Sequence, residues 1–141
     1  MKNQDWLKML KNFNDDDNYP LILIVDDDPS LRQALEEIFE FSGYAVLTAA
    51  SAYEGLHMLH DTEMKPSLII SDVLMNEMDG YQFYRTLYQE EEWRDIPFIF
   101  LSAKSKLRDD AERRGLQVQG YMSKPFIVED LLSTVANLVQ D

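Results

Sequence analysis

The chain has 141 residues, enough for one domain built around a single hydrophobic core. Its 26 acidic and 13 basic residues give a formal net charge of −13, which repels nucleic-acid phosphates and anionic lipids, so we expect this segment to bind neither. The absence of cysteine excludes disulfides and thiolate chemistry. The longest apolar run, residues 96–101, is too short to span a bilayer, and residues 1–18 lack a signal peptide's apolar stretch, so we expect a cytoplasmic location.

The first 18 residues differ from the rest of the chain. Four apolar side chains recur there at i, i+3, i+4 and i+7, the spacing that lines one face of a short helix: Trp6, Met9, Leu10 and Phe13. The polar run NDDDN then ends the pattern. We interpret residues 1–18 as an N-terminal extension, a short helix plus a linker, and residues 19–141 as the main domain. Such a helix either packs on its own domain, frays in solvent or binds a partner.

From residue 21 onward, short apolar strands alternate with segments of helical spacing. The predicted strands are 21–25, 44–49, 67–71, 97–102 and 120–123, and the predicted helices lie at 31–39, 56–59, 83–88, 104–116 and 128–139. The strands are apolar on both faces, which is typical of a parallel sheet covered by helices on both sides. We therefore predict an α/β fold with three layers and a doubly wound, five-stranded parallel sheet of order 2-1-3-4-5, the flavodoxin-like order.

Helix signals support these assignments. Ser51 and Glu54 have the spacing of a capping box, and Asp79 stands where it can cap the third helix. The segment 104–116 is the weakest, because only Leu107, Ala111 and Leu116 are apolar, so we expect a short, loosely held fourth helix.

Charged and hydroxyl side chains follow the ends of the predicted strands. Asp26, Asp27 and Asp28 follow the first strand and Asp72 the third, while Ser102 ends the fourth and Lys124 follows the fifth. In the predicted sheet these ends converge on one cleft. Carboxylates about 4 Å apart repel one another by about 4 kcal/mol per pair at an effective dielectric constant near 20, so the cleft needs positive charge. Mg²⁺ suits it, since this ion binds through one or two carboxylates, waters and phosphate oxygens.

Four motifs in this order resemble the receiver domain of bacterial two-component response regulators. They are ILIVDDDPSLR, LIISDVLMNEMDGYQF, PFIFLSAKS and GYMSKPF, and the resemblance covers residues 21–140. It implies that Asp72 is the phosphoacceptor and forms an aspartyl phosphate. It also implies that Mg²⁺ is bound by Asp26, Asp27, Asp72 and the backbone carbonyl of Leu74, with Asp26 acting largely through water.

The resemblance also assigns a switch. It implies that Ser102 is the switch hydroxyl, Tyr121 the rotating aromatic side chain and Lys124 the phosphate-binding lysine, followed by a cis bond to Pro125. On phosphorylation Ser102 would move toward the phosphoryl oxygens and Tyr121 would fill the space it leaves. The surface formed by the fourth helix, the fifth strand and the last helix would then change shape.

The implied partners are a sensor histidine kinase or phosphotransfer protein as donor and a downstream effector protein or domain. The domain would not be an enzyme beyond its own phosphorylation and dephosphorylation. Whether it stands alone or belongs to a longer regulator or hybrid kinase, and whether it forms a homodimer on activation, stays open at this stage. Three departures from the family pattern stand out: Asn76 where proline is usual, QVQG at 117–120, and Ile127 in place of a polar helix cap.

Two other functions compete with this interpretation. A haloacid dehalogenase-like phosphatase would use Asp26 and Asp28 in an Asp-x-Asp motif, together with Ser102 and Lys124. Against it, the sequence has no cap-like segment and leaves Asp72 without a role. The second alternative is a receiver-like binding module that is never phosphorylated, which the complete set of acid, hydroxyl and lysine side chains argues against.

Overall fold

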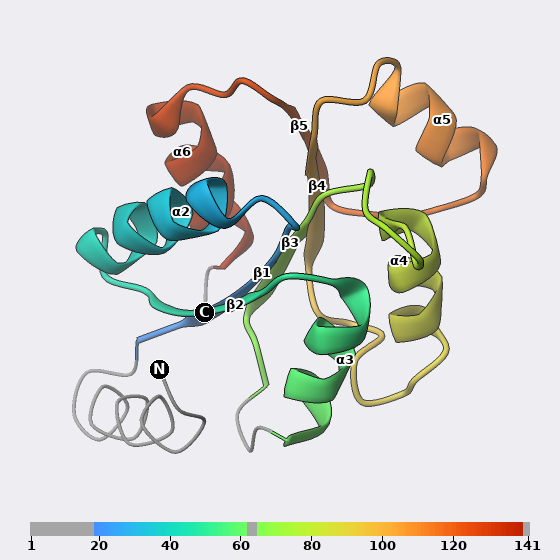
Figure 1. The fold of residues 1–141 in the computed structure, drawn as a ribbon, viewed down its shortest axis with the longest axis horizontal. Helices are drawn as coiled ribbons and strands as arrows, with labels where there is room; N and C mark the ends of the chain where they lie inside the picture. The colour runs from blue at the N-terminus through green and yellow to red at the C-terminus, as the bar shows by residue number, and fades with distance from the viewer. Residues whose placement is uncertain (1–18, 62–64, 140–141) are drawn as a thin grey trace.

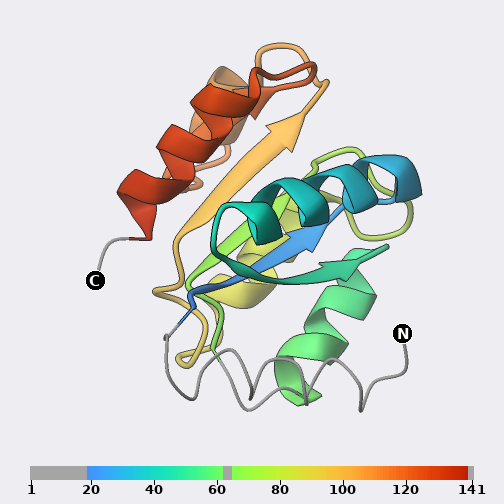
Figure 2. The same cartoon turned by 90° about the vertical axis from the view of Figure 1, so that its left-hand side faces the viewer.

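The computed structural model describes residues 19–61 and 65–139, and the predicted N-terminal helix lies outside this part of the chain. Five parallel strands form one sheet in the order β2-β1-β3-β4-β5, as the sequence predicted. Their bounds are β1 Leu21–Val25, β2 Ala45–Ala49, β3 Leu68–Ser71, β4 Phe98–Ser102 and β5 Gly120–Ser123. Figure 2 shows the strand arrows pointing toward the same edge of the sheet.

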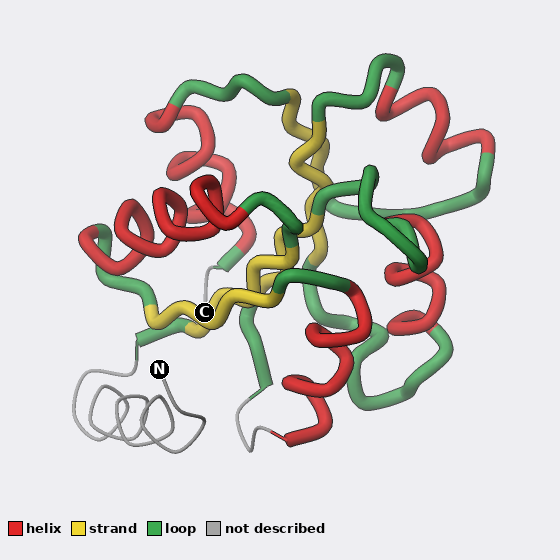
Figure 3. The backbone as a smooth tube through the Cα atoms, in the orientation of Figure 1, coloured by secondary structure: helices red, strands yellow, loops and turns green. Residues whose placement is uncertain are grey.

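Helices cover both faces of the sheet. Their bounds are α2 Pro29–Phe41, α3 Ala52–Asp61, α4 Gly80–Tyr88, α5 Leu107–Arg113 and α6 Val128–Leu138. Helices α2 and α6 lie on one face and α3, α4 and α5 on the other (Figures 1 and 3). The protein therefore has the three-layer, flavodoxin-like architecture. No helix within residues 19–61 and 65–139 has the length and apolar character that crossing a membrane requires.

The central strands supply the core of both layers. Along β1, Leu23 packs in the cluster beneath α3, α4 and α5, whereas Ile24 packs in the cluster beneath α2 and α6. All five residues of β1 are buried. Because successive side chains of a strand point to opposite faces, a continuous apolar run is what a strand covered on both sides needs.

The structure corrects several predicted boundaries. Strands β2, β3 and β4 each begin one residue later than predicted. Helix α5 spans only Leu107–Arg113, because Lys106, with a left-handed φ of 55°, precedes its first turn. A seven-residue helix agrees with the expectation of a short fourth helix.

Helix starts agree with the sequence in part. Asp79 forms a complete capping box with Gln82. The Ser51 hydroxyl accepts from the Glu54 N–H at 3.1 Å, but the Glu54 carboxylate accepts from the Ala50 N–H at 3.0 Å, one residue before the expected partner. Ile127 provides no side-chain cap for α6.

The unusual QVQG segment is ordered by Gln119. Its side-chain carbonyl accepts from the Phe98 N–H at 2.7 Å, and its backbone N–H donates to the Phe98 carbonyl at 2.9 Å. One glutamine thus satisfies both backbone groups at the start of β4. This contact holds the turn before β5 against the start of β4.

Asp28 caps α2, because its Oδ1 accepts from the N–H groups of Ser30 and Leu31 at 3.0 and 3.3 Å. We expect Asp28→Ala to lower the free energy of unfolding by about 1 kcal/mol, the usual value of such a cap. Asp28→Asn is the matched control and should change it by a few tenths of a kcal/mol, roughly, since asparagine caps as well as aspartate. Urea unfolding measures both, and an equal loss in the two variants would contradict a capping role.

Candidate functional site

The strand register brings the candidate residues to one edge of the sheet. Val25 of β1 pairs with Ser71 of β3, so the next residue of each strand, Asp26 and Asp72, emerges at the same level. The Asp72 N–H donates to the Val25 carbonyl at 3.0 Å, which continues the ladder one step beyond the strand. On the other side the Lys124 N–H donates to the Ser102 carbonyl at 2.9 Å. The backbone pairing of the strands therefore sets the level at which Asp26, Asp72 and Lys124 leave the edge of the sheet.

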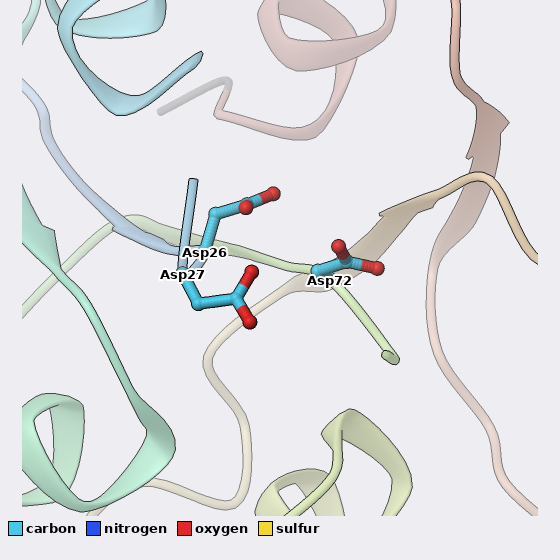
Figure 4. Close-up of side chains that lie close together, drawn as sticks. All are labelled: Asp26, Asp27 and Asp72. Carbon is cyan, nitrogen blue, oxygen red and sulfur yellow. The ribbon is translucent and has the colours of Figure 1, made fainter. Parts of the chain in front are cut away.

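Three carboxylates gather at this edge. One oxygen from each of Asp26, Asp27 and Asp72 lies within 4.8 Å of the others. Figure 4 shows them at the ends of β1 and β3. Asp26 and Asp72 are buried, with 2% and 6% of their surface exposed, whereas Asp27 is exposed. Hard carboxylate oxygens in a partly open cluster fit a small divalent cation such as Mg²⁺.

Lys124 bridges the two buried carboxylates. Its Nζ lies 2.7 Å from Asp26 Oδ2 and 2.8 Å from Asp72 Oδ2, so one ammonium group binds both. Burial by itself would lower the pKa of Lys124, but the hydrogen bonds to the two carboxylates raise it above its usual value. The lysine therefore stays charged.

The carboxylate of Asp72 is held on both oxygens. Its Oδ1 accepts from the N–H groups of Val73 and Leu74, at 2.6 and 3.2 Å, while Oδ2 accepts from Lys124. These bonds keep the group in one orientation at the rim of the sheet. Leu74 itself is 55% exposed, and only its backbone N–H contacts the Asp72 carboxylate.

Asp26 is more constrained than Asp27. Its Oδ1 accepts from the Asp28 N–H at 2.9 Å, and its carbonyl accepts from Arg32 Nη1 at 2.8 Å. Burial raises the pKa of Asp26, the hydrogen bond from Lys124 opposes this shift, and the charge of Asp72 adds to it. A further positive charge beside Asp26 would favour its ionised form.

Ser102 and Tyr121 lie on neighbouring strands. Ser102 is fully buried at the end of β4, and its Oγ accepts from the Lys104 N–H at 3.3 Å. Tyr121 is partly buried in β5, where its ring lies under the guanidinium of Arg108, 4.7 Å from the ring centre. Within the described residues, neither side chain contacts the carboxylate cluster through a hydrogen bond. The structure thus brings together Asp26, Asp27, Asp72 and Lys124, with Ser102 one strand away.

Sequence reasoning missed Asp110 on α5. Its carboxylate accepts from the Tyr81 hydroxyl at 2.9 Å and pairs with Lys104 at 3.3 Å and Arg113 at 2.7 Å. The hydrogen bond from Tyr81, with the positive charge of Lys104, lowers the pKa of Asp110 despite some desolvation. Asp110 therefore ties α5 both to the start of α4 and to the loop after Ser102. An aspartate within a charged helix gives no sequence signal for this role.

The comparisons with known proteins agree with this fold. Residues 22–136 match the family model of the response regulator receiver domain. The chain belongs to the response regulator receiver domain family, whose members are signalling domains of two-component systems.

Individual relatives are moderately similar to the chain. It is 34% identical over 119 residues to response regulator Rre1 from Synechocystis, covering 84% of this chain and 51% of that protein. It is 31% identical over 114 residues to protein PilG from Pseudomonas aeruginosa, covering 81% of this chain and 83% of PilG. The chain thus spans only about half the length of relatives such as Rre1.

Solved structures share the fold. The chemotaxis protein CheY4 of Vibrio cholerae has a TM-score of 0.77 and 29% identity, with 85% of this chain and 98% of that one covered. The receiver domain of a signal transduction histidine kinase from Syntrophus aciditrophicus has a TM-score of 0.76 and 37% identity, covering 85% and 89%.

Gly80 lies against the backbone of the candidate phosphoacceptor. A Cβ there would collide with the Asp72 carbonyl oxygen and lie 2.8 Å from the Val73 Cα. We expect Gly80→Ala to lower the free energy of unfolding by about 1 to 3 kcal/mol, because backbone atoms would have to move. The exposed Ser133→Ala in α6 is the control and should stay within about 0.5 kcal/mol of the parent. Equal urea midpoints for the parent, Gly80→Ala and Ser133→Ala would contradict this prediction, because the loop after Asp72 would then accommodate the added methyl group without cost.

Proposed function

We propose that Asp72 receives a phosphoryl group from the phosphohistidine of a sensor histidine kinase or phosphotransfer protein. A carboxylate oxygen of Asp72 attacks phosphorus, the phosphorus–nitrogen bond breaks, and the imidazole leaves with its electron pair. The product is an acyl phosphate on Asp72. The observation that carries this proposal is the cluster in which the Asp72 carboxylate pairs with Lys124 and lies within 4.8 Å of oxygens of Asp26 and Asp27.

The residues around Asp72 have separate tasks in this proposal. Asp26, Asp27, Asp72 and the carbonyl of Leu74 would hold Mg²⁺, which supplies positive charge to the phosphoryl oxygens when bound. The backbone N–H groups of Val73 and Leu74 orient the carboxylate. Lys124, which pairs with Asp72 before transfer, would pair with the phosphoryl group afterwards, so its charge serves both states.

The proposed response involves Ser102 and Tyr121. Ser102 would donate to a phosphoryl oxygen, and Tyr121 would move into the space that Ser102 leaves. The resulting change would reach the surface of α5, β5 and α6, where a downstream effector would bind. Helix α5 is suited to such movement, because it is only seven residues long and has two buried side chains, Leu107 and Ala111.

The phosphatase alternative is less favoured, because the Asp28 carboxylate already caps α2 and its residue is exposed. We therefore expect the chain to act through its own phosphorylation and dephosphorylation in the cytoplasm, and not to turn over other substrates.

Phosphorylation can be tested with Mg²⁺ and acetyl phosphate, followed by intact mass. We expect the parent to gain one phosphoryl group and Asp72→Asn to gain none, because the amide lacks the nucleophilic oxygen. Chelation of Mg²⁺ should abolish the gain. Asp28→Asn is the matched control and should still be labelled, since it retains the helix cap.

Two results would contradict the proposal. One is an unchanged mass of the parent under saturating donor. The other is steady turnover of a phosphomonoester that disappears in Asp28→Asn and persists in Asp72→Asn, as the phosphatase alternative requires.

Replacement of Lys124 tests whether its positive charge offsets the negative charges of Asp26 and Asp72. We expect Lys124→Met to lower the free energy of unfolding by about 1 to 3 kcal/mol without Mg²⁺, because two carboxylates lose their partner. Mg²⁺ should then raise the melting temperature of this variant more than that of the parent, since the ammonium no longer competes for Asp26 and Asp72.

The control for this experiment is Lys65→Met, which removes an exposed lysine paired with Asp95 at 2.8 Å. Its response to Mg²⁺ should equal that of the parent. If Mg²⁺ shifts the melting temperature of all three proteins equally, Lys124 and the cation do not share ligands.

A further inference from the structure

A groove lies between the end of α4 and the turn that connects α5 to β5. Its volume is about 360 Å³, and its lining includes Tyr84, Arg85 and Tyr88 from α4 and Arg114, Leu116 and Gln117 from the turn. Both helices begin near the carboxyl edge of the sheet and end at the opposite edge, so the groove is remote from Asp72. Its lining residues come from α4, from the residue after α4 and from the turn after α5, and none of them belongs to α6.

The charged residues that line the groove are both basic. Arg114 Nε lies 3.6 Å from Asp110 Oδ2, so its charge is partly offset by that carboxylate and Arg85 supplies the main positive charge of the groove on an acidic protein. Arg85 forms no salt bridge within residues 19–61 and 65–139; its Nη2 donates to the Arg114 carbonyl at 3.2 Å. That bond fixes the guanidinium, and its other N–H groups are available to a ligand.

The aromatic side chains of the groove are held in place. The Tyr84 hydroxyl donates to the Gln117 carbonyl at 3.0 Å, which ties α4 to the turn. Tyr88 is 46% exposed, and the centre of its ring lies 5.9 Å from the centre of the Tyr84 ring. The guanidinium carbon of Arg94 lies 5.7 Å from the centre of the Tyr88 ring. Arg94 Nε also donates to the Tyr88 carbonyl at 2.8 Å. Because these side chains are already held in place, they lose little conformational entropy when a ligand binds, which favours binding.

We propose that this groove binds an acidic peptide segment of a partner protein, with a carboxylate on Arg85 and an apolar side chain against Tyr88 and Leu116. Arginine and tyrosine are the residues that most often anchor protein interfaces, and a guanidinium matches a carboxylate. A nucleic acid fits less well, because its phosphates would extend beyond the groove over the rest of a chain whose formal net charge is −13. A second copy of the chain would meet the same repulsion.

The test uses the full chain and a fluorescent peptide of glutamate and leucine with one tryptophan, measured by anisotropy at low salt. We expect saturable binding, a loss of affinity of about tenfold in Arg85→Gln and a similar loss in Tyr88→Ala. Arg113→Gln removes an equal charge from an exposed arginine of α5 outside the lining, and should bind within about twofold of the parent. Arg114 is left intact because it also stacks on Tyr81, 4.4 Å from the ring centre.

Three results would overturn the proposal: no saturable binding to the parent, equal losses in Arg85→Gln and Arg113→Gln, or tighter binding of a single-stranded oligonucleotide than of the peptide. A peptide in which glutamine replaces glutamate should bind at least about tenfold more weakly, because it lacks the carboxylates. Asp72→Asn should bind the peptide like the parent, and Arg85→Gln should still be phosphorylated and melt like the parent. The measurements on Asp72→Asn and Arg85→Gln therefore distinguish a failure of the peptide-binding proposal from a failure of the phosphorylation proposal.

Discussion

One ammonium group between two buried carboxylates is the contact on which the candidate site depends. Lys124 lies within 2.8 Å of an oxygen of both Asp26 and Asp72. These residues come from the beginning, the middle and the last part of the domain sequence, and each follows a different strand. Without the lysine, two like charges would be buried side by side, an arrangement that proteins avoid unless a cation or a proton compensates. The fold and the charge of the site are thus mutually dependent.

Backbone pairing explains why this contact forms at all. The pairing of Val25 with Ser71, and of Ser102 with Ser123, sets the level at which Asp26, Asp72 and Lys124 leave the sheet. A slip of one residue in either ladder would turn a carboxylate or the lysine toward a helix layer. The continuous apolar strands prevent such slips, because both of their faces are buried and every residue has a fixed place in the core.

Much of this arrangement could be predicted from the sequence, because strand periodicity, strand order and polar strand ends all point to the same edge. Of the six residues predicted to converge there, Asp26, Asp27, Asp72 and Lys124 come together, whereas Asp28 caps α2 and Ser102 ends the neighbouring strand. Contacts that depend on three-dimensional packing could not be predicted. Gln119 replaces a backbone partner with its side chain, and Asp110 gathers partners from three segments. Nothing in local spacing distinguishes such residues from ordinary surface polar ones.

The network around Asp110 determines what it takes to reorient α5. Asp110 fastens this helix to its neighbours through contacts with the Tyr81 hydroxyl and with Lys104, while its pair with Arg113 lies within the helix. Leu107 and Ala111 are the buried side chains of α5. Polar contacts of this kind can be exchanged for water one at a time, whereas a larger apolar face would have to leave the core as a unit. A change in the tilt of α5 would therefore break its polar contacts to Tyr81 and Lys104 and disturb two buried side chains, while the backbone pairing of the five strands does not include this helix.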